Sequence, residues 1–230
     1  MPDGSLHLLA NIAWHSLTGP HAPASTGTDD ARRYASGFPP IIAFEDMTRP
    51  NFPALAPHCQ PGEHLYCVGW SGPAPAGWVI RAEATLIKMV WAAPEPATDA
   101  GAGAARLGPE HVPQMLDLVA LTKPGPFGPR AIELGEYFGF FDGPCLVAMA
   151  GERMFAGALR ELSGVCTHPA FQGRGLARGL MQVLLRRELR RGETPFLHVR
   201  RNNRSAHAMY ERMGFRDRLE LVARVLLRTA

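Results

Sequence analysis

No stretch of the sequence is apolar enough to cross a membrane. A transmembrane helix needs about 18 or more consecutive apolar residues, and the 230 residues contain no such run. The opening residues Met1-Pro2-Asp3-Gly4 also lack the basic region with which a secretion signal begins. We therefore expect a cytoplasmic protein that has no membrane partner.

Cysteine is scarce and irregularly placed. The four cysteines, at positions 59, 67, 145 and 166, form no framework that would predict disulfides, so reduced thiols are expected. The segment from 58 to 67 holds two histidines and two cysteines, but it contains no C-x-x-C and no second pair of ligands. Zinc sites normally have such pairs, and we expect no bound metal.

Charge is distributed unevenly along the chain. Residues 151–230 hold 16 arginines and 7 acidic residues, whereas residues 1–150 hold 8 basic and 14 acidic residues. A basic C-terminal half suits a ligand that carries several phosphates. Nucleic acid would also suit it, but neither an aromatic-rich basic face nor a known reader motif is present, and we expect no nucleic-acid partner.

A glycine-rich junction stands out in the basic half. Gly173, Gly175 and Gly179 lie where an expected strand, residues 161–167, gives way to an expected helix, residues 176–191. Glycine tolerates positive φ and adds no side-chain bulk. Backbone N–H groups can then converge on an anion at the positive end of the helix dipole. The junction predicts a pyrophosphate-binding loop.

Two common phosphate-binding loops do not fit this junction. A dinucleotide-binding fold has G-x-G-x-x-G after its first strand, and a Walker loop has Gly-Lys followed by Ser or Thr. The segment here, Gln172-Gly173-Arg174-Gly175-Leu176-Ala177, lies late in the chain and has neither pattern. It fits Gln/Arg-x-x-Gly-x-Gly/Ala, and so resembles the acetyl-CoA loop of the GNAT acyltransferase superfamily.

A second segment resembles the next motif of the same superfamily. It runs from Asn203 through Ala206 and Tyr210 to Gly214-Phe215. The resemblance covers roughly residues 104–230. The sequences of residues 165–169 and 196–199 are similar to those in the branch of the superfamily that includes glycine N-acyltransferase-like C-terminal domains.

A Pro-, Gly- and Ala-rich stretch, residues 93–103, predicts a linker with a boundary near residue 100. We expect a smaller α+β domain over residues 1–100, on the substrate side, which could be a degenerate copy of the catalytic fold. Its expected helices are residues 6–17 and 29–35, and its expected strands are 41–44, 64–69, 77–81 and 85–91.

Residues 101–230 are expected to form the catalytic, acyl-CoA-binding domain. Helices are predicted at 108–121, 130–134, 176–191 and 203–213, and strands at 104–107, 137–141, 145–150, 158–167 and 195–200, with further strands within 215–227. The fold class is therefore α+β. The resemblance implies a mostly antiparallel GNAT-type sheet with flanking helices.

The resemblance also implies which residues hold the cofactor, acetyl-CoA. The pyrophosphate is expected on the loop, and the pantetheine arm is expected along the strand before it. An oxyanion contact is expected from the main chain near Val165 or Cys166. The full set is Val165, Cys166, Thr167, Gln172, Gly173, Arg174, Gly175, Leu176, Ala177, Arg178 and Asn203. For Arg178 a solvated helix face is the alternative, and Asn203 is also a good N-cap.

Two residues are the catalytic candidates. Tyr210 matches the tyrosine that protonates the leaving thiolate in this superfamily; the alternative is a buried tyrosine that anchors its helix. Glu161 begins the strand that leads to the loop and is the predicted general base; the alternative is a solvent-facing or ion-paired residue. Cys166, His168 and His198 are interpreted as structural.

The sequence thus predicts an N-acetyltransferase that transfers an acetyl or other acyl group from acetyl-CoA to a primary amine by direct attack. The amine belongs to a small molecule or a peptide. The alternative from another class is a CoA-binding sensor or pseudoenzyme without transferase activity. The oligomeric state stays open, with a homodimer among the options.

Overall fold

The computed structural model describes residues 3–97 and 101–229. In this part of the chain one 11-stranded sheet has the strand order β1-β2-β3-β4-β11-β5-β10-β9-β8-β7-β6. The strands are β1 (Ser25–Gly27), β2 (Ala31–Tyr34), β3 (Ile41–Phe44), β4 (His64–Val68), β5 (Trp78–Trp91), β6 (Ala105–Arg106), β7 (Tyr137–Asp142), β8 (Cys145–Ala156), β9 (Leu159–Thr167), β10 (Thr194–Arg200) and β11 (Phe215–Arg228). Neighbouring strands are antiparallel except for β3 with β4 and β9 with β10.

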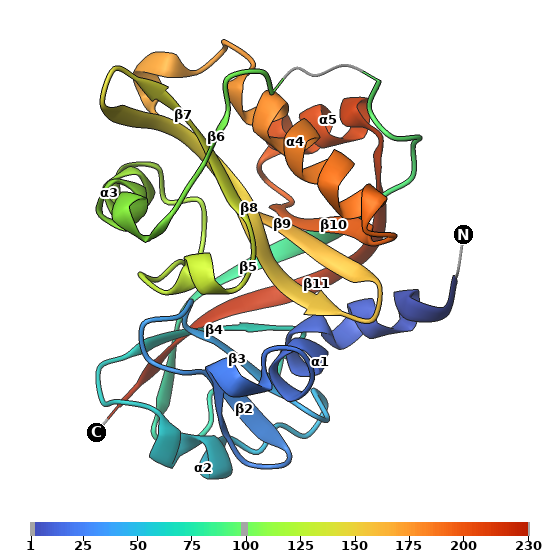
Figure 1. Cartoon of the computed structure of the whole chain (residues 1–230). Coiled ribbons are helices and arrows are strands. Elements are labelled where there is room, and N and C mark those ends of the chain that lie inside the picture. The colour runs from blue at the N-terminus through green and yellow to red at the C-terminus, as the bar shows by residue number, and fades with distance from the viewer. Residues whose placement is uncertain (1–2, 98–100, 230) are drawn as a thin grey trace.

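Helices cover both faces of this sheet (Figure 1). They are α1 (Ile12–Thr18), α2 (Phe52–Leu55), α3 (Val112–Thr122), α4 (Leu176–Arg190) and α5 (Arg204–Met213), with 3-10 turns at η1 (Asp3–Asn11), η2 (Ala22–Ala24), η3 (Ala56–His58), η4 (Pro109–His111), η5 (Ala131–Glu133) and η6 (Pro169–Phe171). The predicted α+β class with a mostly antiparallel sheet is confirmed. No helix within the described ranges is long and apolar enough to span a bilayer.

The two faces have separate cores. On one face, Leu180 and Leu184 of α4 and Tyr210 of α5 pack with the sheet residues Leu197 and Val199. The other face is covered by η1, α1 and α3, where for example Ile12 packs with Phe196. Because side chains alternate along a strand, residues of β10 on either side of Leu197 point to the α1 face.

The sheet is continuous across the boundary predicted near residue 100. Strand β5 comes from before that boundary, yet it pairs with β10 on one side and with β11 on the other. The described parts of the predicted linker, residues 93–97 and 101–103, form neither helix nor strand. Residues 98–100, where the boundary itself falls, lie outside the described residues.

Strands β9 and β10 pair only over part of their length. Their register begins at Thr194 with Leu159 and ends at Leu197 with Leu162. Beyond that point β9 is irregular, because Gly164 has a positive φ of 63° and the pairing of β9 with β8 shifts there. A bulge of this kind bends a strand and increases its twist, so the two strands separate and leave a gap in the sheet.

Three expectations about elements were wrong. Residues 29–35 are not a helix, because β2 pairs with β1 and β3 and buries Tyr34 completely, and this tertiary pairing overrides helix propensity. The two strands expected at 77–81 and 85–91 are the single strand β5, in which a register shift replaces the expected turn. The several terminal strands expected within 215–227 are the single strand β11.

Candidate active site

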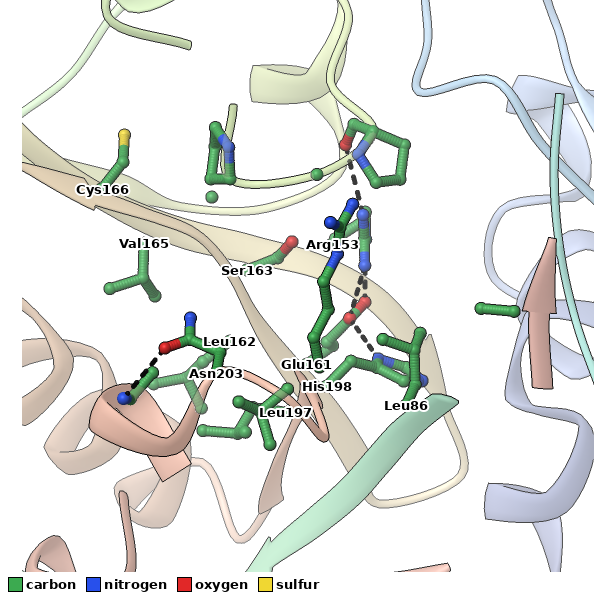
Figure 2. Close-up of a pocket in the computed structure, with 18 of the residues that line it drawn as sticks. Leu86, Arg153, Glu161, Leu162, Ser163, Val165, Cys166, Leu197, His198 and Asn203 are labelled. Carbon is green, nitrogen blue, oxygen red and sulfur yellow. Dashed lines mark hydrogen bonds and ion pairs between the residues drawn. The ribbon is translucent and has the colours of Figure 1, made fainter. Parts of the chain in front are cut away.

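A groove of about 870 Å³ passes through the gap between β9 and β10. On the α4 and α5 face it is lined by the glycine loop and by Asn203 and Tyr210. On the α1 face it is lined by Arg153, Glu161 and His198 (Figure 2). The gap therefore joins two chemically different half-sites on opposite faces of one sheet.

The glycine loop presents unpaired amides to the groove. The backbone N–H groups of residues 173–178 donate to no acceptor in the described part of the chain, and the first bonded amide is that of Gly179, which donates to Gly175 O at 3.0 Å. The first turn of a helix has such free donors. Here the N-cap of α4 is Gly175, which supplies no side-chain cap. The row of amides is thus available to an anion.

Two glycines make this row accessible. Gly173 and Gly175 have φ values of +76° and +79°, which only glycine adopts readily. A Cβ added at either position would meet no atom within 4 Å, so the space in front of the loop is open. The loop can therefore hold a diphosphate against its main chain, which is the fit that acetyl-CoA requires.

Strand β9 turns further amides toward the gap. The N–H of His168 donates to Val147 O on β8 at 2.8 Å. Because amides alternate in direction along an antiparallel strand, the N–H groups of Thr167 and Val165 point away from β8 and toward the unpaired side. These are the main-chain positions predicted to contact the pantetheine arm and the acetyl oxygen.

Most of the predicted cofactor residues line the groove. They are Val165, Cys166, Thr167, Gln172, Gly173, Gly175, Leu176, Ala177, Arg178 and Asn203. Arg174 is not among the lining residues, because its guanidinium lies over the ring of Phe171, 4.6 Å from the centroid, and donates to Ala170 O.

Asn203 and Cys166 also have roles that need no ligand. The side chain of Asn203 accepts from Ala206 N at 3.2 Å, so it is the N-cap of α5. Cys166 packs in the core beneath α3, and burial raises the pKa of its thiol to about 11. A thiol in that state is a poor nucleophile.

Tyr210 lies on the α5 side of the gap. Its side chain is 8% exposed, and its hydroxyl has no hydrogen-bond partner among the described residues. Burial raises the pKa of this phenol to about 12. The hydroxyl is therefore fully protonated at neutral pH and is free to donate.

Glu161 is buried and fully engaged on the opposite side. It is 1% exposed, and its carboxylate accepts from Arg153 Nε at 3.0 Å and Arg153 Nη2 at 2.7 Å, and from the N–H of Met154 at 3.2 Å. The same carboxylate lies 2.7 Å from His198 Nδ1. Although burial opposes ionisation, the guanidinium and the imidazole hold its pKa well below the usual range. The ion-paired alternative considered for this residue is the arrangement found.

His198, which the sequence analysis interprets as structural, lies beside Glu161 and lines the groove. Its ring is buried, and desolvation lowers its pKa although Glu161 opposes this shift, so the imidazole is neutral at pH 7. A neutral ring that donates its Nδ1–H to Glu161 keeps a lone pair on Nε2, for which the described chain offers no partner. Only long-range strand pairing brings His198 next to Glu161, because Glu161 pairs with Phe196, which lies two residues before His198 on the neighbouring strand.

Within residues 3–97 and 101–229, no group of three or more His, Cys, Asp or Glu side chains is arranged to hold a metal ion. His58 and Cys59, from the cysteine- and histidine-containing segment, instead bond to Thr26 and to Leu55 O.

The chain is similar to one protein family and to several solved structures. Residues 137–224 match a family described as FR47-like protein. A crystal structure of an acetyltransferase from the GNAT family of Novosphingobium aromaticivorans is 33% identical, with a TM-score of 0.88 over 97% of this chain and 100% of that one. A GCN5-related N-acetyltransferase from Kribbella flavida shares the fold, at 16% identity and a TM-score of 0.59 over 96% of this chain and 95% of that one. No curated protein matches. The match to the Novosphingobium acetyltransferase covers nearly the whole chain, and the separated strands and free amides of the groove agree with it. The chain therefore belongs to the GNAT family of acetyltransferases.

Proposed function

We propose that the protein is an acetyl-CoA-dependent N-acetyltransferase in which a primary amine attacks the thioester directly. The observation that carries this proposal is the groove through the sheet, which joins the free amide row on one face to the Glu161–His198 pair on the other. Direct attack requires that both substrates are held at once in suitable orientation, and a groove open to both faces provides this.

In this proposal, backbone N–H groups make most of the contacts with acetyl-CoA. The amides of residues 173–178 receive the pyrophosphate, and Arg178, which lines the groove, adds positive charge. The unpaired edge of β9 receives the pantetheine arm, with the N–H of Val165 as the donor to the acetyl oxygen. The N–H of Cys166, the other candidate, points toward β8 like that of His168. Acetyl-CoA supplies the activated acetyl group, and the protein supplies orientation and proton transfer.

The base is assigned to Glu161 and His198 acting together. An amine must lose a proton before its lone pair can attack. His198 Nε2 takes that proton, while Glu161 holds the ring through Nδ1 and stabilises the imidazolium that forms. In this assignment Glu161 contributes to base catalysis through His198, because its own oxygens are occupied by Arg153 and Met154.

The acid is assigned to Tyr210. As the new C–N bond forms, the C–S bond breaks and the sulfur leaves with its electron pair. The phenol of Tyr210 gives its proton to that sulfur. The nitrogen loses its second proton as the amide forms, and this proton passes through water to the Tyr210 oxygen, while His198 releases the first proton to water. A phenol that stays protonated at neutral pH is suited to this role.

The test is thiol release from acetyl-CoA in the presence of a panel of primary amines. We expect release above the hydrolysis background with at least one class of amine, and a fall in kcat of roughly 10²-fold or more in Tyr210→Phe. Calorimetric binding of acetyl-CoA without release by any amine, and unchanged behaviour of Tyr210→Phe, would instead indicate a CoA-binding sensor.

A further inference from the structure

Lys88 is a buried ammonium without a carboxylate partner. It lies on β5, is 2% exposed and lines the groove on the α1 face. Its Nζ donates to Leu9 O at 2.6 Å and to Ala10 O at 3.4 Å. In the described part of the chain it forms no ion pair, although buried charges are normally paired.

The nearest acid cannot serve as the counterion of Lys88. Glu161 attracts Lys88 electrostatically but bonds instead to Arg153 and His198. An ammonium has three hydrogens, and backbone carbonyls engage two of them. Desolvation lowers the pKa of Lys88 to about 8, so it is still mostly charged at pH 7. One donor and one uncompensated positive charge therefore remain beside the groove.

The other charges that line the groove also favour an anionic guest. Glu83 and Glu161 are its acidic lining residues, and each is paired with an arginine, Arg224 and Arg153 respectively. A polyamine or a lysine-rich peptide would find no free carboxylate here. The lining also contains the exposed basic residues Lys123, Arg178, Arg200 and Arg212, and Lys88 is the buried one that forms no ion pair in the described part of the chain. An acceptor with its own negative charge would therefore be attracted to the groove and could pair with Lys88.

We propose that Lys88 binds the carboxylate of the acceptor, so that the substrate is an amino carboxylic acid. This inference rests on the proposed function. Lys88 stands directly opposite His198 in the pairing of β5 with β10. Directly opposite residues have Cβ atoms about 4.5–5.5 Å apart. A carboxylate at Lys88 and an amine at His198 therefore belong to one small molecule in which a few bonds separate the two groups.

The remaining walls indicate what the rest of this acceptor is like. Ile12, Leu86 and Phe127 line the groove together with Ile41 and Tyr66. These side chains are apolar or aromatic, and such walls suit an apolar substituent. An α-amino acid with an apolar side chain meets all three requirements: an amine, an adjacent carboxylate and an apolar body.

The experiment compares matched acceptors that differ in the carboxylate alone. Leucine and phenylalanine are tested beside their amides, with spermidine and phosphoethanolamine as further probes, and thiol release gives kcat and KM. We expect kcat/KM for the acids to exceed that for the amides roughly 10- to 100-fold, which is the usual range for a charge-assisted hydrogen bond. In Lys88→Met the acids should fall to the level of the amides through KM, while the amides change little.

A matched control separates this role from a structural one. Lys123, at the C-terminal end of α3, is a second lysine that lines the groove. If Lys88 is the residue that binds the carboxylate, Lys123→Met should keep the preference for acids. If Lys88→Met does not fold, the comparison of acids and amides in the unaltered protein still tests whether the acceptor's carboxylate is recognised. Equal transfer to amides or spermidine, or an equal loss for acids and amides in Lys88→Met, would overturn the inference and leave the proposed function intact. Preference for phosphoethanolamine would overturn the carboxylate assignment. Release with no amine at all would overturn both proposals.

Discussion

The imidazole of His198 and the phenol of Tyr210 lie on opposite faces of the sheet, with the gap between β9 and β10 between them. Burial acts on the two groups in opposite senses. It lowers the pKa of His198 and raises that of Tyr210 to about 12, because in each case it disfavours the charged form. At neutral pH one group is an unprotonated base and the other a protonated acid, which is the pairing that acyl transfer to an amine needs.

The first prediction concerns His198→Gln. We expect kcat to fall roughly 10²- to 10⁴-fold, the usual contribution of a general base, with the acetyl-CoA dissociation constant unchanged. Because the pKa of His198 is lowered from 6.5, activity of the unaltered protein should persist at pH 7 and be lost as pH falls below about 6.5. Steady-state rates across pH measure both effects.

His207→Gln is the matched control for this prediction. His207 pairs with Asp217 at 2.8 Å on the outside of α5, away from the groove lining. That variant should retain full activity and the same pH profile. Undiminished turnover by His198→Gln would remove His198 from the mechanism.

The second prediction concerns a buried acid that the mechanism does not use. Glu188 on α4 is 0% exposed, and both of its carboxyl oxygens lack hydrogen-bond partners in the described structure. Desolvation, with Glu152 and Glu193 nearby, raises its pKa well above 4.5. Below pH 4.5 the group is protonated in both the folded and unfolded states. As pH rises past 4.5 only the unfolded state loses the proton readily, and the free energy of unfolding falls.

Glu188→Gln should remove this pH-dependent loss. The variant and the unaltered protein should melt alike near pH 4, and the variant should melt higher at pH 8, by roughly 2–4 °C for each kcal/mol gained. Glu193→Gln is the opposite case, because Arg160 and Arg191 lower the pKa of Glu193; it should melt lower at pH 8. A lower melting temperature of Glu188→Gln at pH 8 would contradict this account.

At the level of elements, helix α4 is bounded by two comparable glycines. Gly175 precedes the helix with φ +79°, and Gly192 follows it with φ +74°; in both cases an added Cβ would meet nothing within 4 Å. Gly175→Asp places a negative charge at the amide row, whereas Gly192→Asp imposes similar backbone strain at the other end. The pair therefore separates anion binding from folding.

The third prediction follows from this comparison. Gly175→Asp should weaken acetyl-CoA binding at least 10-fold by calorimetry, because a carboxylate repels the pyrophosphate and occupies its space. Gly192→Asp should bind acetyl-CoA as the unaltered protein does. Equal affinity in the two variants would show that the diphosphate is held elsewhere.

The elements that carry the motifs could be predicted from the sequence because their signals are local. Helix α4 and strand β10 were placed to within one or two residues by glycines, apolar periodicity and proline. Strand β2 was mistaken for a helix, because the partners that make it a strand are other segments of the chain. The resemblance to glycine N-acyltransferase-like domains stays a prediction.

The same distinction applies to the active site. The loop and Tyr210 were predicted as site residues from contiguous motifs, and they line the groove. The partners of Glu161 come from two other strands. Lys88 meets His198 only because β5 pairs with β10. No local pattern contains that pairing, so the acceptor side of the groove could not be derived from the sequence.

At the level of the whole molecule, the sheet depends on a strand from each part of the chain. Strand β5, of 14 residues, pairs with β11 along its whole length and with β10 over residues 86–90. Without it, both neighbours would have unpaired edges, and the core residues Met89 and Trp91 would be missing. The division into domains 1–100 and 101–230 stays a prediction that fragments can test.

The fourth prediction is that residues 101–230 expressed alone do not fold. Circular dichroism and limited proteolysis should report a protease-sensitive chain without a cooperative melting transition. Co-expression with residues 1–97 should restore a stable, acetyl-CoA-binding complex, because the missing strand is then supplied in trans. A stable, monomeric 101–230 fragment would support independent domains instead.

Strand β11 is the last element of the chain, yet it lies in the middle of the sheet between β4 and β5. During translation, β4 and β5 are synthesised well before the strand that lies between them in the sheet. Ala223 and Val225 of this strand also line the groove. A nascent chain that stops before residue 215 therefore has the glycine loop but lacks the part of the groove that β11 supplies.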